Sequence, residues 1–138
     1  MSLKKKAENL NALLPVLGDM EAPSVFLGGD CTDNDWREEI KKDYVEKFVV
    51  LDPYDSKWDA KKNIYTELAG LVMADHVVFY KGGKGSENEK AFLKRLNLPY
   101  QDFEDLDELK QYLDSLDGTK KIQSLPEMMR RTAGLIIA

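Results

Sequence analysis

A glycine-rich segment with a glutamate close behind it is the part of this sequence best suited to chemistry on a small molecule. Residues 82–86 read Gly-Gly-Lys-Gly-Ser, and Glu89 follows three positions after Ser86. Glycine lets the backbone turn sharply and approach a ligand closely, and a helix that begins here offers unpaired N–H groups to an anion. The Lys-Ser/Thr ending of a P-loop is missing, which argues against nucleoside triphosphate hydrolysis. An ordinary glycine-rich turn is the alternative interpretation.

Glu89 itself has two interpretations. The spacing from Ser86 is that of a capping box, in which the glutamate reaches back to the start of its helix. The functional interpretation is a carboxylate in the first helical turn beside a glycine-lined pocket, where it attacks a sugar carbon or stabilises a cation. The spacing alone favours the cap. Glu87 is a second candidate, but its helix position predicts a solvated side chain.

Two other polar residues suit a site, each with a structural alternative. Glu67 falls at the margin of an apolar helical stripe, so its carboxylate faces either the cleft or the rim. Asp30 follows a strand end and the pair Gly28-Gly29, where its side chain either enters the cleft or forms an Asx-turn. His76 has no Cys, His or carboxylate at ligand spacing. We therefore expect no metal site and no cofactor.

The elements that must position these residues are short apolar strands alternating with amphipathic helices. The strands are continuously apolar, which is typical of a parallel sheet covered by helices on both faces. Because ligands bind outside the carboxyl ends of such strands, three segments should converge there: residues 28–30, the loop after Leu51, and residues 82–89. The expected strands are 24–27, 48–51, 77–80 and a weak one at 100–103, and the last expected helix of the core is 106–113. The fold class is α/β, with four to five strands in three layers.

Length and composition place the whole chain, 1–138, in one domain with a core at 24–116 and a helical tail at 119–138. The net charge of −5 disfavours nucleic acid and acidic membrane surfaces as partners. A single cysteine, Cys31, suits a reducing compartment. The basic start lacks the apolar run of a signal peptide, and no apolar run is long enough to span a bilayer. We therefore expect a cytoplasmic protein.

Three pieces of the sequence, in order, resemble the nucleoside 2-deoxyribosyltransferase family, over about residues 24–96. The first is Val-Phe-Leu-Gly-Gly at 25–29 with Asp-Trp-Arg at 35–37. The second is Glu67, eight residues before Asp75. The third is Gly-Ser-Glu-Asn-Glu at 85–89, which is similar to the family's Gly-Thr-x-x-Glu, whose glutamate is the nucleophile.

This resemblance implies a flavodoxin-like fold and cleavage of N-glycosidic bonds with retention, through a covalent glycosyl-enzyme on Glu89. Glu67 matches the family's acidic residue that contacts the nucleobase. The sequence departs from the family at Gly83, because the family has an acidic residue at this position, six before the nucleophile. It also has no match for the asparagine that, in the family, a neighbouring subunit supplies from late in its chain. The expected site consists of catalytic Glu89 and Glu67 with substrate-binding Gly28, Gly29, Asp30, Gly83, Gly85 and Ser86.

A second resemblance covers residues 81–89. They are similar to the Pro-Gly-Gly-x-Gly-Thr-x-x-Glu motif of the cytokinin-activating nucleoside-monophosphate phosphoribohydrolases, without its proline. Both resemblances imply a nucleoside or nucleotide as ligand and Glu89 as the acting residue. A catalytically inactive nucleotide-binding module is the remaining alternative. The apolar residues 135–137 near the chain end, together with the missing asparagine, predict a homo-oligomer.

Overall fold

Four short strands form one parallel sheet in the computed structural model, which describes residues 22–55 and 64–118. They are β1 (Ser24–Gly29), β2 (Val49–Leu51), β3 (His76–Tyr80) and β4 (Gln101–Phe103). Their order across the sheet is β2-β1-β3-β4, and every neighbouring pair is parallel. All four expected strands are therefore confirmed, with ends that differ by one or two residues.

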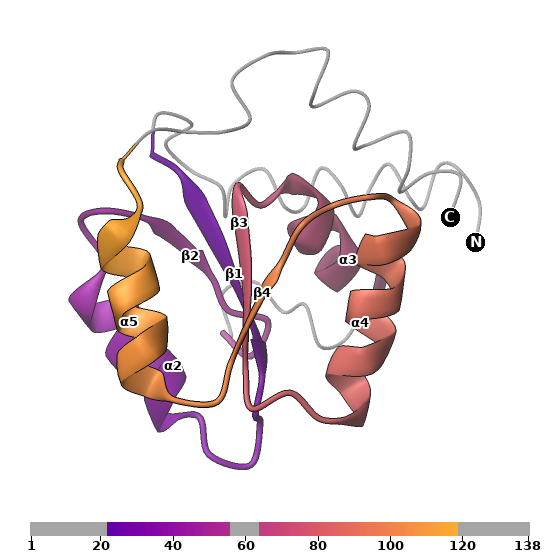
Figure 1. Cartoon of the computed structure of the whole chain (residues 1–138), viewed down its shortest axis with the longest axis horizontal. Coiled ribbons are helices and arrows are strands. Elements are labelled where there is room, and N and C mark those ends of the chain that lie inside the picture. Colours follow the sequence, from indigo (N-terminus) through magenta and orange to yellow (C-terminus); the bar gives the residue numbers. More distant parts are fainter. Residues whose placement is uncertain (1–21, 56–63, 119–138) are drawn as a thin grey trace.

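Four helices cover the two faces of this sheet (Figure 1). Helices α2 (Asp35–Asp43) and α5 (Leu106–Ser115) lie on one face, and α3 (Ile64–Met73) and α4 (Lys84–Arg95) lie on the other. The result is a three-layer α/β fold of the flavodoxin type, as the alternation of apolar strands and amphipathic helices predicts. Within the described residues, no helix is long and apolar enough to cross a membrane.

Two apolar clusters hold the layers together, one on each face. Successive strand residues point to opposite faces, so Phe26 packs into one cluster and its neighbours Val25 and Leu27 into the other. Each of these three side chains is at most 1% exposed. Because the central strands are buried on both faces, they need an apolar residue at nearly every position, which explains their unbroken apolar pattern.

A buried polar contact joins the amino ends of the two central strands. The Asp75 carboxylate accepts hydrogen bonds from the backbone N–H of Ser24 at 2.8 Å and from its hydroxyl at 3.2 Å. The Ser24 hydroxyl in turn accepts from the Asp75 N–H at 3.0 Å. Asp75 therefore lies at the edge of the sheet opposite the carboxyl ends and aligns β1 with β3.

The expected helical tail at 119–138 and the apolar residues 135–137 lie outside the described residues.

Candidate functional site

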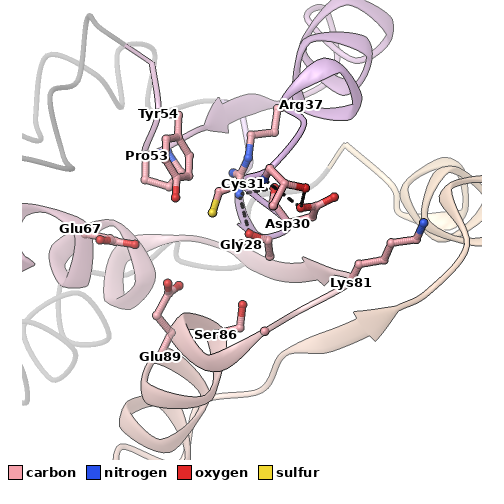
Figure 2. A pocket seen from close by; sticks show the side chains of 13 residues that line it. Gly28, Asp30, Cys31, Arg37, Pro53, Tyr54, Glu67, Lys81, Ser86 and Glu89 are labelled. Atoms are coloured by element: carbon pink, nitrogen blue, oxygen red, sulfur yellow. Dashed lines mark hydrogen bonds between the residues drawn. The ribbon is translucent and has the colours of Figure 1, made fainter.

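A cavity of about 240 Å³ opens at the carboxyl ends of β1 and β3. The chain passes from β1 to β2 on one side and from β3 to β4 on the other, so this is where the strand order reverses. Such a reversal leaves a crevice because the two connections leave the sheet in opposite directions. The lining comes from residues 28–32, the loop residues Pro53 and Tyr54, and side chains of α2, α3 and α4 (Figure 2). All three segments expected to converge do so.

The two glycines that end β1 form a wall that no larger residue would fit. A Cβ on Gly28 would lie 2.4 Å from the Phe79 ring and 3.5 Å from Oε2 of Glu89. Gly29 has φ +113°, and a Cβ there would lie 2.0 Å from the Tyr80 carbonyl oxygen. The backbone of β1 is therefore bare where it meets the cavity, and the Glu89 carboxylate lies against it.

Glu67 and Glu89 come from different helices and line the same cavity. Figure 2 shows both carboxylates turned toward it, Glu67 from α3 and Glu89 from α4. Glu67 is 5% exposed, so its carboxylate faces the cleft and does not extend to the solvent at the rim. Most enzymes that act on glycosidic bonds use a pair of carboxylates, so this pair is a candidate for such chemistry.

The start of α4 differs from the capping-box interpretation. The helix begins at Lys84, with Gly83 as N-cap and no side-chain cap. Ser86 is its third residue and Glu89 lies in its second turn, so Glu89 is too far along to cap the helix. The hydrogen bond from the Glu87 N–H to the Gly83 carbonyl, at 3.2 Å, starts the helical ladder. The capping-box interpretation is therefore wrong, and the Glu89 side chain lies in the cavity wall.

The remaining residues of the glycine-rich segment surround this helix start. Gly83 and the buried Ser86 line the cavity, and Gly85 belongs to the first turn of α4. A Cβ on Gly83 would meet nothing within 4 Å. The space beside the N-cap would therefore admit a side chain, and glycine is not required there for steric reasons. Lys81, which also lines the cavity, takes a left-handed backbone with φ +47°.

Arg37 is a buried cation at the centre of the site, and reasoning from residue types and spacing did not identify it. Its side chain is 1% exposed and donates hydrogen bonds to the carbonyl oxygens of Leu27 and Gly29. It also forms an ion pair with Asp52 at 3.3 Å. Burial lowers the pKa of Arg37, while the negative charges of Asp52 and Glu89 oppose that change. One signal was available: Arg37 lies three residues before Ile40, beside the apolar stripe of its helix.

Asp52 holds the loop after β2 against this cation. Its carboxylate accepts a hydrogen bond from the backbone N–H of Tyr54 at 2.9 Å and pairs with Lys41 at 2.9 Å. With Arg37 on the same carboxylate, two cations of α2 hold the turn that carries Pro53 and Tyr54, and the Tyr54 N–H closes the turn on itself. The loop therefore forms a defined wall of the cavity.

Asp30 forms the Asx-turn that was the structural alternative to a side chain in the cleft. Its Oδ1 accepts hydrogen bonds from the N–H of Thr32 at 2.9 Å and from its hydroxyl at 2.7 Å, which is an Asx-turn. These two bonds lower the pKa of Asp30. Asp30 lines the cavity, so the turn shapes the rim next to Cys31, which is exposed.

His76 lies at the amino end of β3, far along the strand from the cavity, and its ring is nearly perpendicular to that of Phe48. The described residues contain no group of three or more His, Cys, Asp or Glu side chains arranged to hold a metal ion.

Comparison with known proteins adds no relative to this picture. No family model matches the chain, and neither the curated proteins nor the solved structures include a match to it. The functional argument therefore depends on the fold and on the residues that line the cavity.

Proposed function

We propose that this protein cleaves or transfers the N-glycosidic bond of a deoxynucleoside, a nucleoside or its 5′-monophosphate, with Glu89 as nucleophile. One observation carries the proposal: two carboxylates from different helices, Glu67 and Glu89, line one small cavity at the carboxyl ends of the central strands. The resemblance of residues 85–89 to a family motif that ends in a nucleophilic glutamate supports the same role for Glu89.

In the proposed reaction the Glu89 carboxylate attacks C1′ of the sugar from the face opposite the base. The bond between C1′ and the base nitrogen breaks, its electron pair stays with the base, and the base takes up a proton. Water or an acceptor base then attacks C1′, loses a proton and releases Glu89. Two inversions at C1′ give net retention.

The charges around Glu89 support this role. Burial lowers the pKa of Arg37, and Glu89 is one of the negative charges, after Asp52, that act against this fall, so the Arg37 cation lies within electrostatic reach of Glu89. The carboxylate is the form of Glu89 that would attack C1′. The Arg37 charge is held in place by its bonds to the end of β1, so it needs no rearrangement when substrate enters.

The size of the cavity supports a small substrate. Its volume of about 240 Å³ is below the roughly 300–1,000 Å³ of sites for drug-sized ligands. A nucleoside or nucleoside monophosphate suits this volume better than a dinucleotide does.

The test is a Glu89→Gln variant assayed on a panel of deoxynucleosides, nucleosides and their 5′-monophosphates, with and without an acceptor base. Product is followed by chromatography. We expect a rate loss of at least about 10³-fold, as is usual when a nucleophile is removed. Glu87→Gln is the matched control, because Glu87 is on the same helix and its side chain is 72% exposed. Equal rates for Glu89→Gln and the parent would reject the mechanism.

The same panel separates the two enzyme classes that the sequence resembles. Reaction of free deoxynucleosides with base exchange favours a deoxyribosyltransferase. Reaction of the monophosphates alone, with release of base to water, favours a phosphoribohydrolase and a phosphate nest in the glycine-rich segment.

A nucleotide-binding module without catalysis is the second candidate, and Gly83 favours it. The residue has no side chain at the position where the transferase family carries an acid, and open space surrounds its Cα. Gly83→Asp therefore fits without steric cost. A gain of turnover in Gly83→Asp, starting from a parent that binds nucleotide but makes no product, would identify the parent as a binding module.

We further propose that the chain works as a homo-oligomer, because residues 135–137 are apolar and the resembled family completes its sites across subunits. Light scattering at micromolar concentration measures this directly. A mass near 15.7 kDa would contradict the proposal.

A further inference from the structure

We propose that the ring of Tyr54, which contacts the Arg37 guanidinium, is the surface on which the flat base of the substrate stacks. This inference rests on the proposed function, since it assigns the base-binding wall of the same cavity. The ligand class that it requires is a planar heteroaromatic ring attached to a sugar.

Tyr54 is unusual for its exposure. Among the described residues, Tyr54 and Val45 are the large apolar side chains that are exposed, and Tyr54 retains 39% of its surface. Val45 lies in the turn that follows α2, whereas Tyr54 lines the cavity. An aromatic side chain left open at a cavity is an apolar surface that a ligand can cover.

The Tyr54 ring contacts a cation, and that cation also contacts a second ring. The Arg37 guanidinium carbon lies 4.8 Å from the centre of the Tyr54 ring and 4.6 Å from the centre of the Trp36 ring. Guanidinium planes stack favourably on aromatic faces. A base on the Tyr54 face that Arg37 leaves uncovered would extend this stack by one more flat group.

The backbone of Tyr54 is held in place before any ligand binds. Its N–H donates to Asp52 at 2.9 Å, and Asp52 pairs with both Arg37 and Lys41. A backbone that is already ordered loses little conformational freedom on binding, so more of the stacking energy contributes to affinity.

The geometry suits a nucleoside that spans the cavity. Figure 2 shows Tyr54 on the wall opposite Ser86 and Glu89, with Glu67 at the side between them. A sugar held at Glu89 would direct its base away from α4 and toward the loop that carries Tyr54. The stacking surface and the nucleophile thus lie at the two ends of one nucleoside-sized space.

The test compares a ligand that carries a base with one that lacks it, in the full-length chain with Glu89→Gln to prevent turnover. The probes are 2′-deoxyadenosine 5′-monophosphate and 2-deoxyribose 5-phosphate, and the readout is the dissociation constant of each by calorimetry. We expect Tyr54→Leu to weaken binding of the nucleotide roughly tenfold, as is typical when an aromatic stacking partner is lost, and to change the sugar phosphate less than about twofold. Tyr54→Phe keeps the ring and should match the parent. Val45→Ala is the control for loss of an exposed apolar side chain elsewhere.

Three outcomes would overturn the inference. They are a Tyr54→Leu variant that binds the nucleotide as tightly as the parent, an equal loss for both probes, and a parent that does not bind the nucleotide more tightly than the sugar phosphate. Base-dependent binding that Tyr54→Leu removes, in a protein whose wild type forms no Glu89-dependent product, would keep the stacking surface and discard the proposed reaction.

Discussion

Substitution of Arg37 by methionine removes the buried charge at the cavity while keeping a long side chain in its place. Arg37 is 1% exposed and contacts three elements: the end of β1, the loop after β2 and the ring of Trp36. The variant therefore measures how much of the fold depends on one cation that also faces the proposed site.

The magnitude follows from the partners that lose their donor. Removing one member of a buried ion pair usually costs about 3–5 kcal/mol, because the other charge is left uncompensated. Asp52 keeps Lys41 at 2.9 Å and the Tyr54 N–H at 2.9 Å, which places the ion-pair loss at the low end of that range. The carbonyls of Leu27 and Gly29 each lose a hydrogen bond of about 1 kcal/mol. Methionine recovers part of this by burying apolar surface, so we expect a net loss of about 3–4 kcal/mol.

The measurement is urea denaturation followed by far-ultraviolet circular dichroism. Trp36 fluorescence is not used, because loss of the Arg37 contact would change the signal of the folded state itself. Lys42→Met is the matched control, because Lys42 is an exposed lysine on the same helix. It should change the free energy of unfolding by less than about 0.5 kcal/mol.

A second variant tests whether the loss of stability comes from the ion pair between Arg37 and Asp52. The double substitution Arg37→Met with Asp52→Asn should cost less than the sum of the two single substitutions, because the pair is removed as a unit. A loss below about 1 kcal/mol for Arg37→Met, or full additivity of the two changes, would refute this account of the ion pair.

Two further predictions concern stability. Gly29→Ala should lower the free energy of unfolding by at least about 3 kcal/mol, because the backbone has φ +113° and the new Cβ would lie 2.0 Å from the Tyr80 carbonyl oxygen, which forces the strands apart. Gly83→Ala is the control, because a Cβ there meets open space. Equal melting temperatures for the two variants would contradict the steric argument. Tyr44→Phe should cost about 1–2 kcal/mol near neutral pH, since the hydroxyl contacts the Lys110 carbonyl oxygen at 2.9 Å and the Asp114 carboxylate at 2.8 Å. Burial and the Asp114 contact raise the pKa of Tyr44 to about 12, so this phenol stabilises the fold below the ordinary tyrosine pKa of about 10, and the contribution is lost as the pH rises toward 12. Denaturation at a series of alkaline pH values checks this, and a parent and variant with the same pH dependence above 10 would refute it.

The layers of the fold could be predicted from the sequence because their signals are local. Unbroken apolar runs at 25–27 and 77–80 indicate strands buried on both faces, and the helices between them have apolar stripes of helical period. The convergence of residues 28–30, the loop after Leu51 and residues 82–89 followed from the parallel topology alone.

The start of α4 could not be predicted correctly, because the capping-box spacing indicates a later start than the structure has. Ser86 and Glu89 have the spacing of a capping box, but Lys84 and Gly85 have already entered the helix. The first N–H groups of a helix need no side-chain cap where they face solvent or a cavity, so the cap pattern did not determine the boundary.

The sequence by itself determined which elements form, and their parallel order predicted that residues 28–30 and 82–89 meet at one crevice. Their spacing left open whether the Glu67 and Glu89 side chains enter that crevice. Only the tertiary structure decided the roles of Arg37, Asp52 and Tyr54. Arg37 and Asp52 are 15 residues apart, and a charged residue on a helix is equally consistent with a solvated face. Burial of that charge becomes favourable only when the end of β1 supplies two carbonyl acceptors and the loop after β2 supplies a carboxylate. Those partners meet only after the sheet has formed, because no local pattern brings them together.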